Sequence, residues 1–301
     1  MRWSSALSPL GSDFETRFFA WLRSCGKLGG SEQPLALKGG RSNHVWKLAG
    51  NPDRVLKLFG SQSANPMFAN SAAREIASLF RLTGTGLVPK LIETGQFEGR
   101  DWVLYDHVAG KSWNRNAGHV AQLLGRLHDQ PVPESLPPGP DGSADWKARG
   151  RDILDLCPAI STRSLCEAMP ETHVEPLGRA FFVHGDPVPG NLIEHDGTLT
   201  LIDWQCPVAG DPAEDLAIFM SPAMQLLYRG APLTSAEEHA FLSSYPDPAV
   251  VARCEQLRPW VHWCMAAYCL WRTGQGQEEY GRAMELELSA LAVQSSMESM
   301  A

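Results

Sequence analysis

Three polar residues follow one another at spacings that suit phosphoryl transfer. Asn191 stands five positions after Asp186, and Asp203 stands twelve positions after Asn191. An aspartate at the first place can accept or orient the hydroxyl of an acceptor, while the asparagine and the second aspartate can hold a Mg²⁺ ion that shields nucleotide phosphates. Hard oxygen ligands of this kind suit Mg²⁺. The spacing therefore predicts Asp186 as the catalytic residue and Asn191 and Asp203 as metal ligands.

Apolar runs beside these residues predict a rigid support for them. Residues 181–183, 192–193 and 199–202 have the composition of short strands, and Asp196 with Gly197 is typical of a hairpin turn between the last two. We expect a small buried sheet that holds the polar residues on its loops.

Longer motifs around the same positions resemble a known family. They read His-x-Asp-x-x-x-x-Asn over 184–191, Ile-Asp-Trp over 202–204 and Gly-Asp-Pro-Ala-Glu-Asp-Leu-Ala over 210–217. In this combination and order they resemble the aminoglycoside phosphotransferase and choline/ethanolamine kinase superfamily. The resemblance implies a two-lobed, protein-kinase-like fold of the α+β class, ATP and Mg²⁺ as cofactors, and a small-molecule hydroxyl as the acceptor.

Three further residues of these motifs are expected to support the site without doing chemistry. His184, beside a glycine and two positions before Asp186, is expected to brace the loop through a hydrogen bond. Asp211 can cap the helix expected to begin at Pro212. We expect Asp215 to hydrogen-bond the catalytic loop.

The nucleotide is expected to meet the N-terminal third of the chain. Gly39 and Gly40 lie between two strand-like runs, and paired glycines let backbone N–H groups approach phosphate closely. An ordinary hairpin turn is the alternative for this pair. The superfamily has a similar Gly-Gly-x-Ser/Thr-Asn loop at this place, which implies a share in nucleotide binding for Ser42 and Asn43.

Lys57 stands on an apolar strand and therefore needs an anionic partner. Glu75, on the following helix, and the nucleotide phosphates are the expected partners, which resembles the Lys–Glu pair of protein kinases. Residues 102–107 should form the hinge between lobes, where backbone groups from Tyr105 to His107 could meet the adenine edge.

The local patterns predict an order of elements that fits two lobes, 1–107 for ATP and 108–301 for catalysis and acceptor binding. The N-terminal lobe is expected to contain a mixed sheet and one helix, residues 69–82, between its strands. The chain from Pro212 onward is mostly helical in pattern. The other expected helices are residues 13–24, 117–129 and 249–272, the last with Pro259 starting or kinking a segment. The expected strands of the N-terminal lobe are residues 35–38, 45–48, 54–59, 91–93 and 102–107.

Composition limits the possible partners. The 301 residues carry a net charge of −8, divided as +4 over residues 1–107 and −12 over residues 108–301. The acidic second part argues against nucleic acid, which needs basic surfaces, and mildly favours a cationic acceptor, although surface acids can simply aid solubility. The sequence contains no apolar run of transmembrane length, and we expect no secretory signal because residues 1–9 lack a long apolar segment. Seven cysteines without a C-x-x-C pair fit reduced thiols in a cytoplasmic protein.

The acceptor is the least determined part of the hypothesis. Trp260, Trp263, Tyr268 and Trp271 could hold an ammonium group by cation–π attraction, but aromatic residues on an internal helix are more often core. Choline and ethanolamine, aminoglycosides, thiamine, amino sugars and homoserine-like compounds all stay open. Gln205 and Cys206 stand where many choline-kinase-like sequences have Glu-Tyr.

We therefore expect an ATP- and Mg²⁺-dependent small-molecule kinase with a hydroxyl acceptor that carries positive charge. Gly185 stands in place of the arginine of protein-kinase H-R-D, and Trp204 follows Asp203 in place of Phe-Gly, so a regulated kinase of protein substrates is not expected. A pseudokinase-like binding protein and a nucleotidyltransferase are the rival hypotheses.

Overall fold

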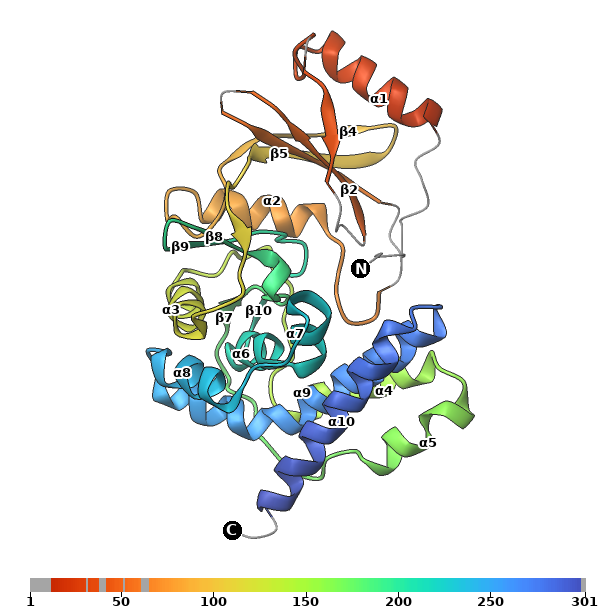
Figure 1. Ribbon diagram of the computed structural model, residues 1–301, viewed down its shortest axis with the longest axis vertical. Helices are drawn as coiled ribbons and strands as arrows, with labels where there is room; N and C mark the ends of the chain where they lie inside the picture. Colours follow the sequence, from red (N-terminus) through yellow and green to blue (C-terminus); the bar gives the residue numbers. More distant parts are fainter. Residues whose placement is uncertain (1–11, 31, 38–41, 51, 61–64, 299–301) are drawn as a thin grey trace.

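The computed structural model describes residues 12–30, 32–37, 42–50, 52–60 and 65–298. Figure 1 shows an N-terminal sheet with helices α1 (Ser12–Ser24) and α2 (Ala72–Arg81), above a C-terminal part that is mostly helical. No helix among the described residues is long and apolar enough to cross a membrane.

The N-terminal sheet has five strands in the order β1-β2-β3-β5-β4, and every neighbouring pair is antiparallel. The expectation of a mixed sheet was wrong. Strands β3 and β5, which are separated along the chain by α2 and β4, also run in opposite directions, so no neighbouring pair among the described strands of this sheet is parallel. The strands are β1 (Pro34–Ala36), β2 (Asn43–Leu48), β3 (Arg54–Phe59), β4 (Leu91–Phe97) and β5 (Arg100–Asp106).

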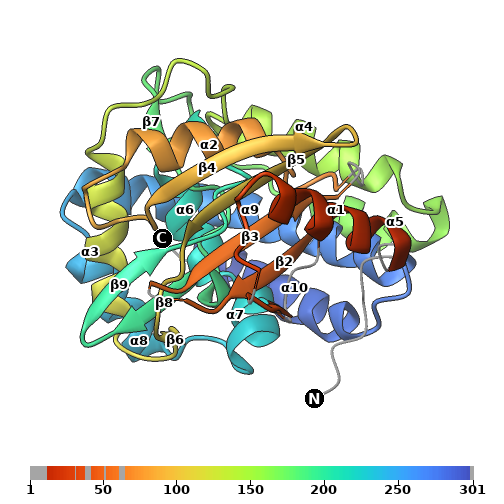
Figure 2. The same ribbon diagram turned by 90° about the horizontal axis from the view of Figure 1, so that it is seen from above.

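The sheet separates two apolar cores, and this arrangement determines which face of the sheet carries the Lys57 side chain. On β3, Leu56 and Leu58 pack into a small core under α1, whereas Val55 and Phe59 pack into the large core shared with the C-terminal part. Because side chains alternate along a strand, Lys57 shares the second face and points away from α1. Figure 2 shows α1 covering the outer face of the sheet.

The C-terminal part begins with short strands that hold the functional loops. Strand β7 (Phe181–Val183) pairs with β10 (Val208–Gly210), while β8 (Leu192–His195) pairs with β9 (Thr198–Leu201) and β6 (Lys111–Ser112). The expected single small sheet is therefore two sheets. Strand β7 belongs to one sheet because it pairs with β10, and β8 and β9 belong to the other, which β6 completes. Strands β6 and β10 are too short to be recognised in the sequence.

The turn between β8 and β9 has the expected form. Asp196 and Gly197 both have positive φ, of 47° and 77°, and the flanking residues His195 and Thr198 pair directly. Two successive residues with positive φ in a two-residue hairpin match a type I′ turn.

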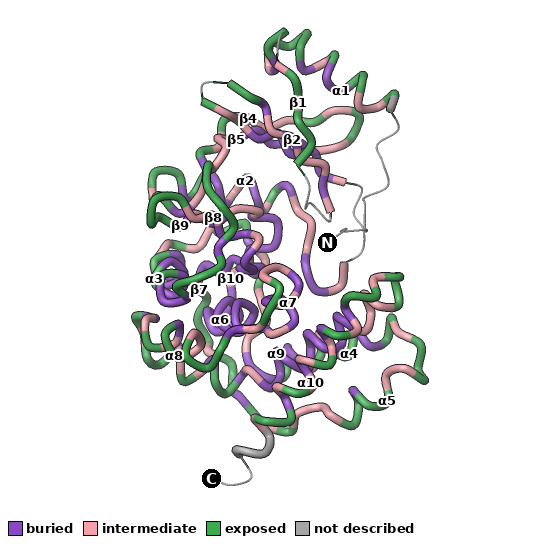
Figure 3. Tube along the Cα trace, in the orientation of Figure 1, coloured by how far each residue is buried: buried purple, intermediate pink, exposed green. Residues whose placement is uncertain are grey.

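The helices of the C-terminal part surround the large core, whose buried residues Figure 3 shows along α6 and α9. The expected helices at 117–129 and 249–272 are present, and Pro259 lies inside the second one without ending it. The helices, with one 3₁₀ turn, are α3 (Ala117–His128), α4 (Ser143–Asp155), α5 (Ala159–Glu167), η1 (Pro189–Asn191), α6 (Ala213–Met220), α7 (Pro222–Arg229), α8 (Ser235–Ser244), α9 (Pro248–Gly274) and α10 (Glu279–Glu298).

Helices α4 and α9 pack closely at Gly150, and this contact supplies a test of the core. A methyl group at Gly150 would strike the buried ring of Trp263. We expect Gly150→Ala to lower the free energy of unfolding by about 1–3 kcal/mol, the usual cost of overpacking, although alanine favours a helix over glycine. Urea unfolding measures the change.

The matched control is Gly281→Ala on α10, where an added Cβ meets nothing within 4 Å. Alanine there should leave stability unchanged or raise it by up to about 1 kcal/mol. Equal effects of the two substitutions would contradict the close packing of α4 on α9.

Candidate active site

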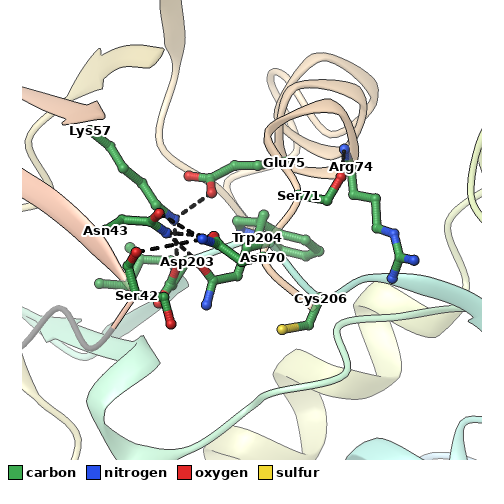
Figure 4. A network of polar contacts seen from close by, with 12 residues as sticks. Ser42, Asn43, Lys57, Asn70, Ser71, Arg74, Glu75, Asp203, Trp204 and Cys206 are labelled. Atoms are coloured by element: carbon green, nitrogen blue, oxygen red, sulfur yellow. Dashed lines mark hydrogen bonds and ion pairs between the residues drawn. The ribbon is translucent and has the colours of Figure 1, made fainter. Parts of the chain in front are cut away.

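Lys57 lies between two carboxylates, as Figure 4 shows. Its Nζ is 2.5 Å from Oε2 of Glu75 on α2 and 2.5 Å from Oδ1 of Asp203, which follows β9. The expected ion pair with Glu75 is therefore present, and Asp203 is a second partner. The side chain of Lys57 is 3% exposed, whereas that of Asp203 is 34% exposed, so Asp203 is the member of this group that faces solvent.

Burial and charge act against each other in this group. Burial disfavours the charge of Lys57, but the carboxylates of Asp203 and Glu75 outweigh it and raise the pKa of Lys57 above its ordinary value. Burial also raises the pKa of Glu75 to about 7, although Lys57 lowers it. The two carboxylates therefore keep Lys57 charged, and the carboxylate of Asp203 is the partly exposed one.

Asp203 has a backbone conformation that side chains seldom adopt. Its φ is 65°, in the left-handed region that Asp and Asn tolerate best among residues other than glycine. Such conformations carry strain and cluster at functional sites.

Asp186 and Asn191 lie on one loop and touch each other. The side-chain Nδ2 of Asn191 donates to the backbone oxygen of Asp186 at 2.9 Å and to its Oδ2 at 3.1 Å. Asp186 and Asn191 are each 8% exposed. Since Nδ2 of Asn191 is engaged in this way, its Oδ1 is the atom left to bind a cation.

Two residues, His184 and Asp215, hold the loop of residues 184–191 by hydrogen bonds as expected, and Asp211 bonds the start of α6. Ring Nδ1 of His184 accepts from the N–H of Asp186 at 3.2 Å, and Nε2 donates to the carbonyl of Ile202 at 3.2 Å. Burial lowers the pKa of His184, which keeps the ring neutral for this pair of bonds. Asp215 accepts from the N–H groups of His184 and Gly185, both at 2.8 Å. Asp211 accepts from the N–H of Ala213, the first residue of α6, at 3.0 Å, although the N-cap position itself is Pro212.

The donor set suits Mg²⁺. It consists of a solvent-facing carboxylate on Asp203 and an amide oxygen on Asn191, and Mg²⁺ is usually held by one or two protein oxygens together with phosphates and water. Among the described residues there is no group of three or more His, Cys, Asp or Glu side chains that could hold a metal without such outside ligands. The two residues fit a Mg²⁺ ion whose other ligands would be nucleotide phosphates and water.

Asn43 has a different environment from the one that the family resemblance suggested. Its Nδ2 donates to Asn70 Oδ1 at 2.8 Å and to Gln205 Oε1 at 2.6 Å, and its Oδ1 accepts from Asn70 Nδ2 and the N–H of Gly60, both at 3.0 Å. These bonds use the full hydrogen-bonding capacity of the side-chain amide, so this amide has no group left for a nucleotide, and a share of the Asn43 backbone in nucleotide binding stays a prediction. Gly39 and Gly40 lie outside the described residues, and Ser42 contributes its carbonyl to Asn70 at 3.5 Å.

Asn70 and Gln205 were not recognised in the sequence as parts of the site. Together with Asn43 they join β2, the segment before α2 and the loop after Asp203. Figure 4 shows the contact between Asn43 and Asn70. Only Gln205 could have drawn attention in the sequence, because it stands where many choline-kinase-like sequences have glutamate. The positions are joined only by the fold, and an isolated asparagine such as Asn70 has no distinguishing pattern.

The hinge offers fewer free donors than expected. The N–H of Asp106 donates to the carbonyl of Lys90 at 3.0 Å, and that of His107 donates to the carbonyl of Asp53 at 2.9 Å. An adenine edge could therefore not use these two N–H groups while they donate to the protein. The Tyr105 side chain is buried, and burial raises its pKa, as does the negative charge of Glu75.

The aromatic residues of α9 do not form a cage for a ligand. Trp260 and Trp263 are buried and donate to the carbonyls of Thr172 and Leu165, so they belong to the core. Tyr268 and Trp271 stack at 5.9 Å, but the guanidinium of Arg272 lies 5.8 Å from each ring centroid. An arginine of the protein thus occupies the cation–π position at this pair.

The buried carboxyl group of Glu214, on α6, predicts a pH dependence of the protein's stability. Burial raises its pKa from the ordinary value of 4.5 to about 7. Between these values the folded protein keeps a proton that the unfolded chain releases, so Glu214 lowers stability as pH rises through this window. Glu214→Gln cannot ionise, and its stability relative to the wild type should rise by about 1–3 kcal/mol between pH 5 and pH 8.

Urea unfolding at both pH values measures this difference. The control is Glu167→Gln, which removes a carboxylate whose side chain is 66% exposed and should give the same difference from the wild type at both pH values. Parallel pH curves for Glu214→Gln and the wild type would contradict the raised pKa.

Comparison with known proteins identifies the family. A profile of the phosphotransferase enzyme family (APH) matches residues 35–253. The chain belongs to this family, which confirms the resemblance found in the sequence motifs. A search of curated proteins finds no match to the sequence.

Solved structures confirm a kinase-like α+β fold. A choline/ethanolamine kinase family protein from Mesorhizobium loti is 14% identical, with a TM-score of 0.64 over 94% of each chain. A choline kinase from Cryptosporidium parvum is 11% identical, with a TM-score of 0.65 over 94% of this chain and 96% of its own. An amicoumacin kinase in complex with AMP-PNP and Ca²⁺ is 15% identical, with a TM-score of 0.57 over 93% of this chain and 96% of its own. Identities of this size establish the fold alone.

Proposed function

We propose that this protein is an ATP- and Mg²⁺-dependent kinase that transfers the γ-phosphoryl group to a hydroxyl of a small molecule. The observation that carries the proposal is the contact of Lys57 with both Glu75 and Asp203, beside a loop that brings Asp186 and Asn191 together. The family match and the nucleotide and metal in the similar amicoumacin kinase support it. The division into lobes at residues 107 and 108 remains a prediction.

Each residue has a task in this scheme. Lys57, held by Glu75, binds nucleotide phosphates, and Asn191 and Asp203 hold the metal, which shields phosphate charge when bound. Asp186 orients the acceptor hydroxyl and receives its proton. The acceptor oxygen forms a bond to the γ-phosphorus while the bond to the bridging oxygen of ADP breaks, so ADP leaves. A loose transition state of this kind depends mainly on positioning.

The acceptor itself needs direct measurement. The acidic C-terminal part favours a cationic compound such as choline, ethanolamine or an aminoglycoside. Against this, the aromatic pair on α9 already carries Arg272. We therefore propose a hydroxyl acceptor without deciding its charge from the aromatic residues.

An acceptor screen with product analysis tests the proposal. Purified protein, ATP and Mg²⁺ are mixed with choline, ethanolamine, thiamine, aminoglycosides, amino sugars and homoserine, and the released nucleotide is identified. ADP together with a phosphorylated acceptor supports the kinase. AMP and pyrophosphate would favour a nucleotidyltransferase, and ATP binding without turnover on any compound would favour a binding protein.

A further inference from the structure

The segment of residues 65–71, which precedes α2, is held by the C-terminal part of the chain. The carbonyl of Met67 accepts from Nη2 of Arg149 on α4 at 2.6 Å, and the carbonyl of Ala69 accepts from the thiol of Cys206 at 3.1 Å. The side chain of Met67 is buried in the large core. Contacts with the C-terminal part therefore fix the place at which α2 begins.

Glu75 takes its position from this segment. Ser71 caps α2, because its side chain accepts from the N–H of Arg74 at 3.3 Å and its carbonyl accepts from the N–H of Glu75 at 3.2 Å. Since these bonds form the first turn of the helix, the place of Ser71 sets the place of the Glu75 backbone. The loop after Asp203 contacts the same segment through Cys206, so Glu75 and Asp203 have neighbouring supports.

The side-chain amide of Asn43 contacts all three segments that carry the lysine and the two carboxylates of the site. Its Oδ1 accepts from the N–H of Gly60, the residue after β3, at 3.0 Å. It forms a reciprocal pair with Asn70, in the segment before α2, at 2.8 and 3.0 Å (Figure 4). Its Nδ2 also donates at 2.6 Å to Oε1 of Gln205, which stands two residues after Asp203. One amide therefore ties the Asp203 loop to the other two segments.

The direct contact between Lys57 and Asp203 is a weaker support for this loop during the proposed reaction. Asp203 gives its Oδ1 to Lys57, and a metal ion bound by Asp203 would compete for the same carboxylate. The φ of 65° at Asp203 is strained, and such a conformation persists only where surrounding residues hold it. The bond between Gln205 and Asn43 does not involve the carboxylate. The two residues are 7% and 5% exposed, so water does not readily replace their bond.

We propose that Gln205 is a positioning residue of the active site, which keeps Asp203 in place for metal binding by tying its loop to Asn43. This inference rests on the proposed kinase function, because Asp203 is the metal ligand of that reaction. Loss of the Gln205 bond leaves Asn43 paired with Asn70 and Gly60. The loss should therefore affect the part of ATP binding that depends on Mg²⁺ more than the part that depends on Lys57.

Titration of ATP by calorimetry, in Mg²⁺ and in excess chelator, tests the inference. Gln205→Leu removes the acceptor oxygen and should weaken ATP binding in Mg²⁺ by about 10-fold, the usual scale for a buried donor left unpaired. ATP affinity in chelator should change by no more than about threefold, because Lys57 and Glu75 keep their contact. Gln205→Glu keeps an acceptor oxygen for Asn43 and should restore the affinity in Mg²⁺ to within about threefold of the wild type.

Gln122→Leu is the matched control, since it makes the same replacement at an exposed residue of α3 and should bind ATP like the wild type. Thermal melting shows whether the variants fold, and Gln205→Ala takes the place of Gln205→Leu if the latter does not. Unchanged affinity in the Gln205 variant, an equal loss with and without Mg²⁺, no restoration by Gln205→Glu, or an equal effect of Gln122→Leu would overturn the inference.

Amide hydrogen exchange across residues 198–206 gives a second measurement that needs no nucleotide. Exchange there should be faster in Gln205→Leu than in the wild type and unchanged in Gln122→Leu, because only the first substitution releases the loop. Unchanged exchange in Gln205→Leu would show that Gln205 does not hold the loop and would overturn the inference. A failure of the wild type to bind ATP would instead contradict the kinase proposal, and hydrogen exchange would then decide alone whether Gln205 holds the loop.

Discussion

Asp186→Ala is expected to lower kcat by about 10²- to 10⁴-fold, the usual range for a residue that handles the reacting proton. The residue lies on the loop with Asn191 and is assigned to the acceptor hydroxyl, so its loss should fall on the chemical step. The KM for ATP should change by no more than about threefold, because Lys57 and the metal ligands remain. ADP release gives kcat, and calorimetry gives the ATP affinity.

The control for this prediction is Asp152→Ala, which removes an exposed carboxylate from α4 and should behave like the wild type. If Asp186→Ala lost ATP binding but kept kcat at saturation, Asp186 would be a nucleotide ligand and the assigned role would be wrong.

Asp203→Asn is expected to reduce turnover by about 10³-fold, because it removes the carboxylate proposed to bind the metal, which is also the partly exposed partner of Lys57. The fold should survive, since asparagine has the same volume and tolerates the φ of 65° at this position. Thermal melting checks the fold, and ADP release at raised Mg²⁺ concentrations measures the activity.

Wild-type protein in excess chelator should lose activity in the same way as Asp203→Asn. Full turnover in the variant, or full wild-type turnover in excess chelator, would contradict the metal assignment.

The sequence predicted the parts of the site whose residues are close together along the chain. Asp186 and Asn191 are five positions apart between apolar runs, and the structure places them on one loop in contact. The hairpin turn at Asp196 and Gly197 was predictable for the same reason, because its conformation depends on those two residues.

The parts that were not predicted depend on contacts between distant segments. Asn43 was assigned to nucleotide binding, but Asn70 and Gln205 take up its hydrogen bonds, and Gln205 is 162 positions away. The position of Arg272 near Tyr268 and Trp271 is different, because this contact lies within one turn of α9 and was missed although its residues are close along the chain. Residue type showed that these side chains could bind a ligand, and only the fold showed that other protein groups occupy them.

Binding of ATP in Mg²⁺ and in excess chelator, measured by calorimetry on wild-type protein and Lys57→Met, tests the central claim most directly. This measurement depends on the group formed by Lys57, Glu75 and Asp203, and it can be made without knowing the acceptor. The account predicts that ATP binds in Mg²⁺ and that removal of either Mg²⁺ or the Lys57 ammonium weakens binding by about 10-fold or more. Equal affinity under all these conditions, or no binding of ATP to the wild type, would contradict it.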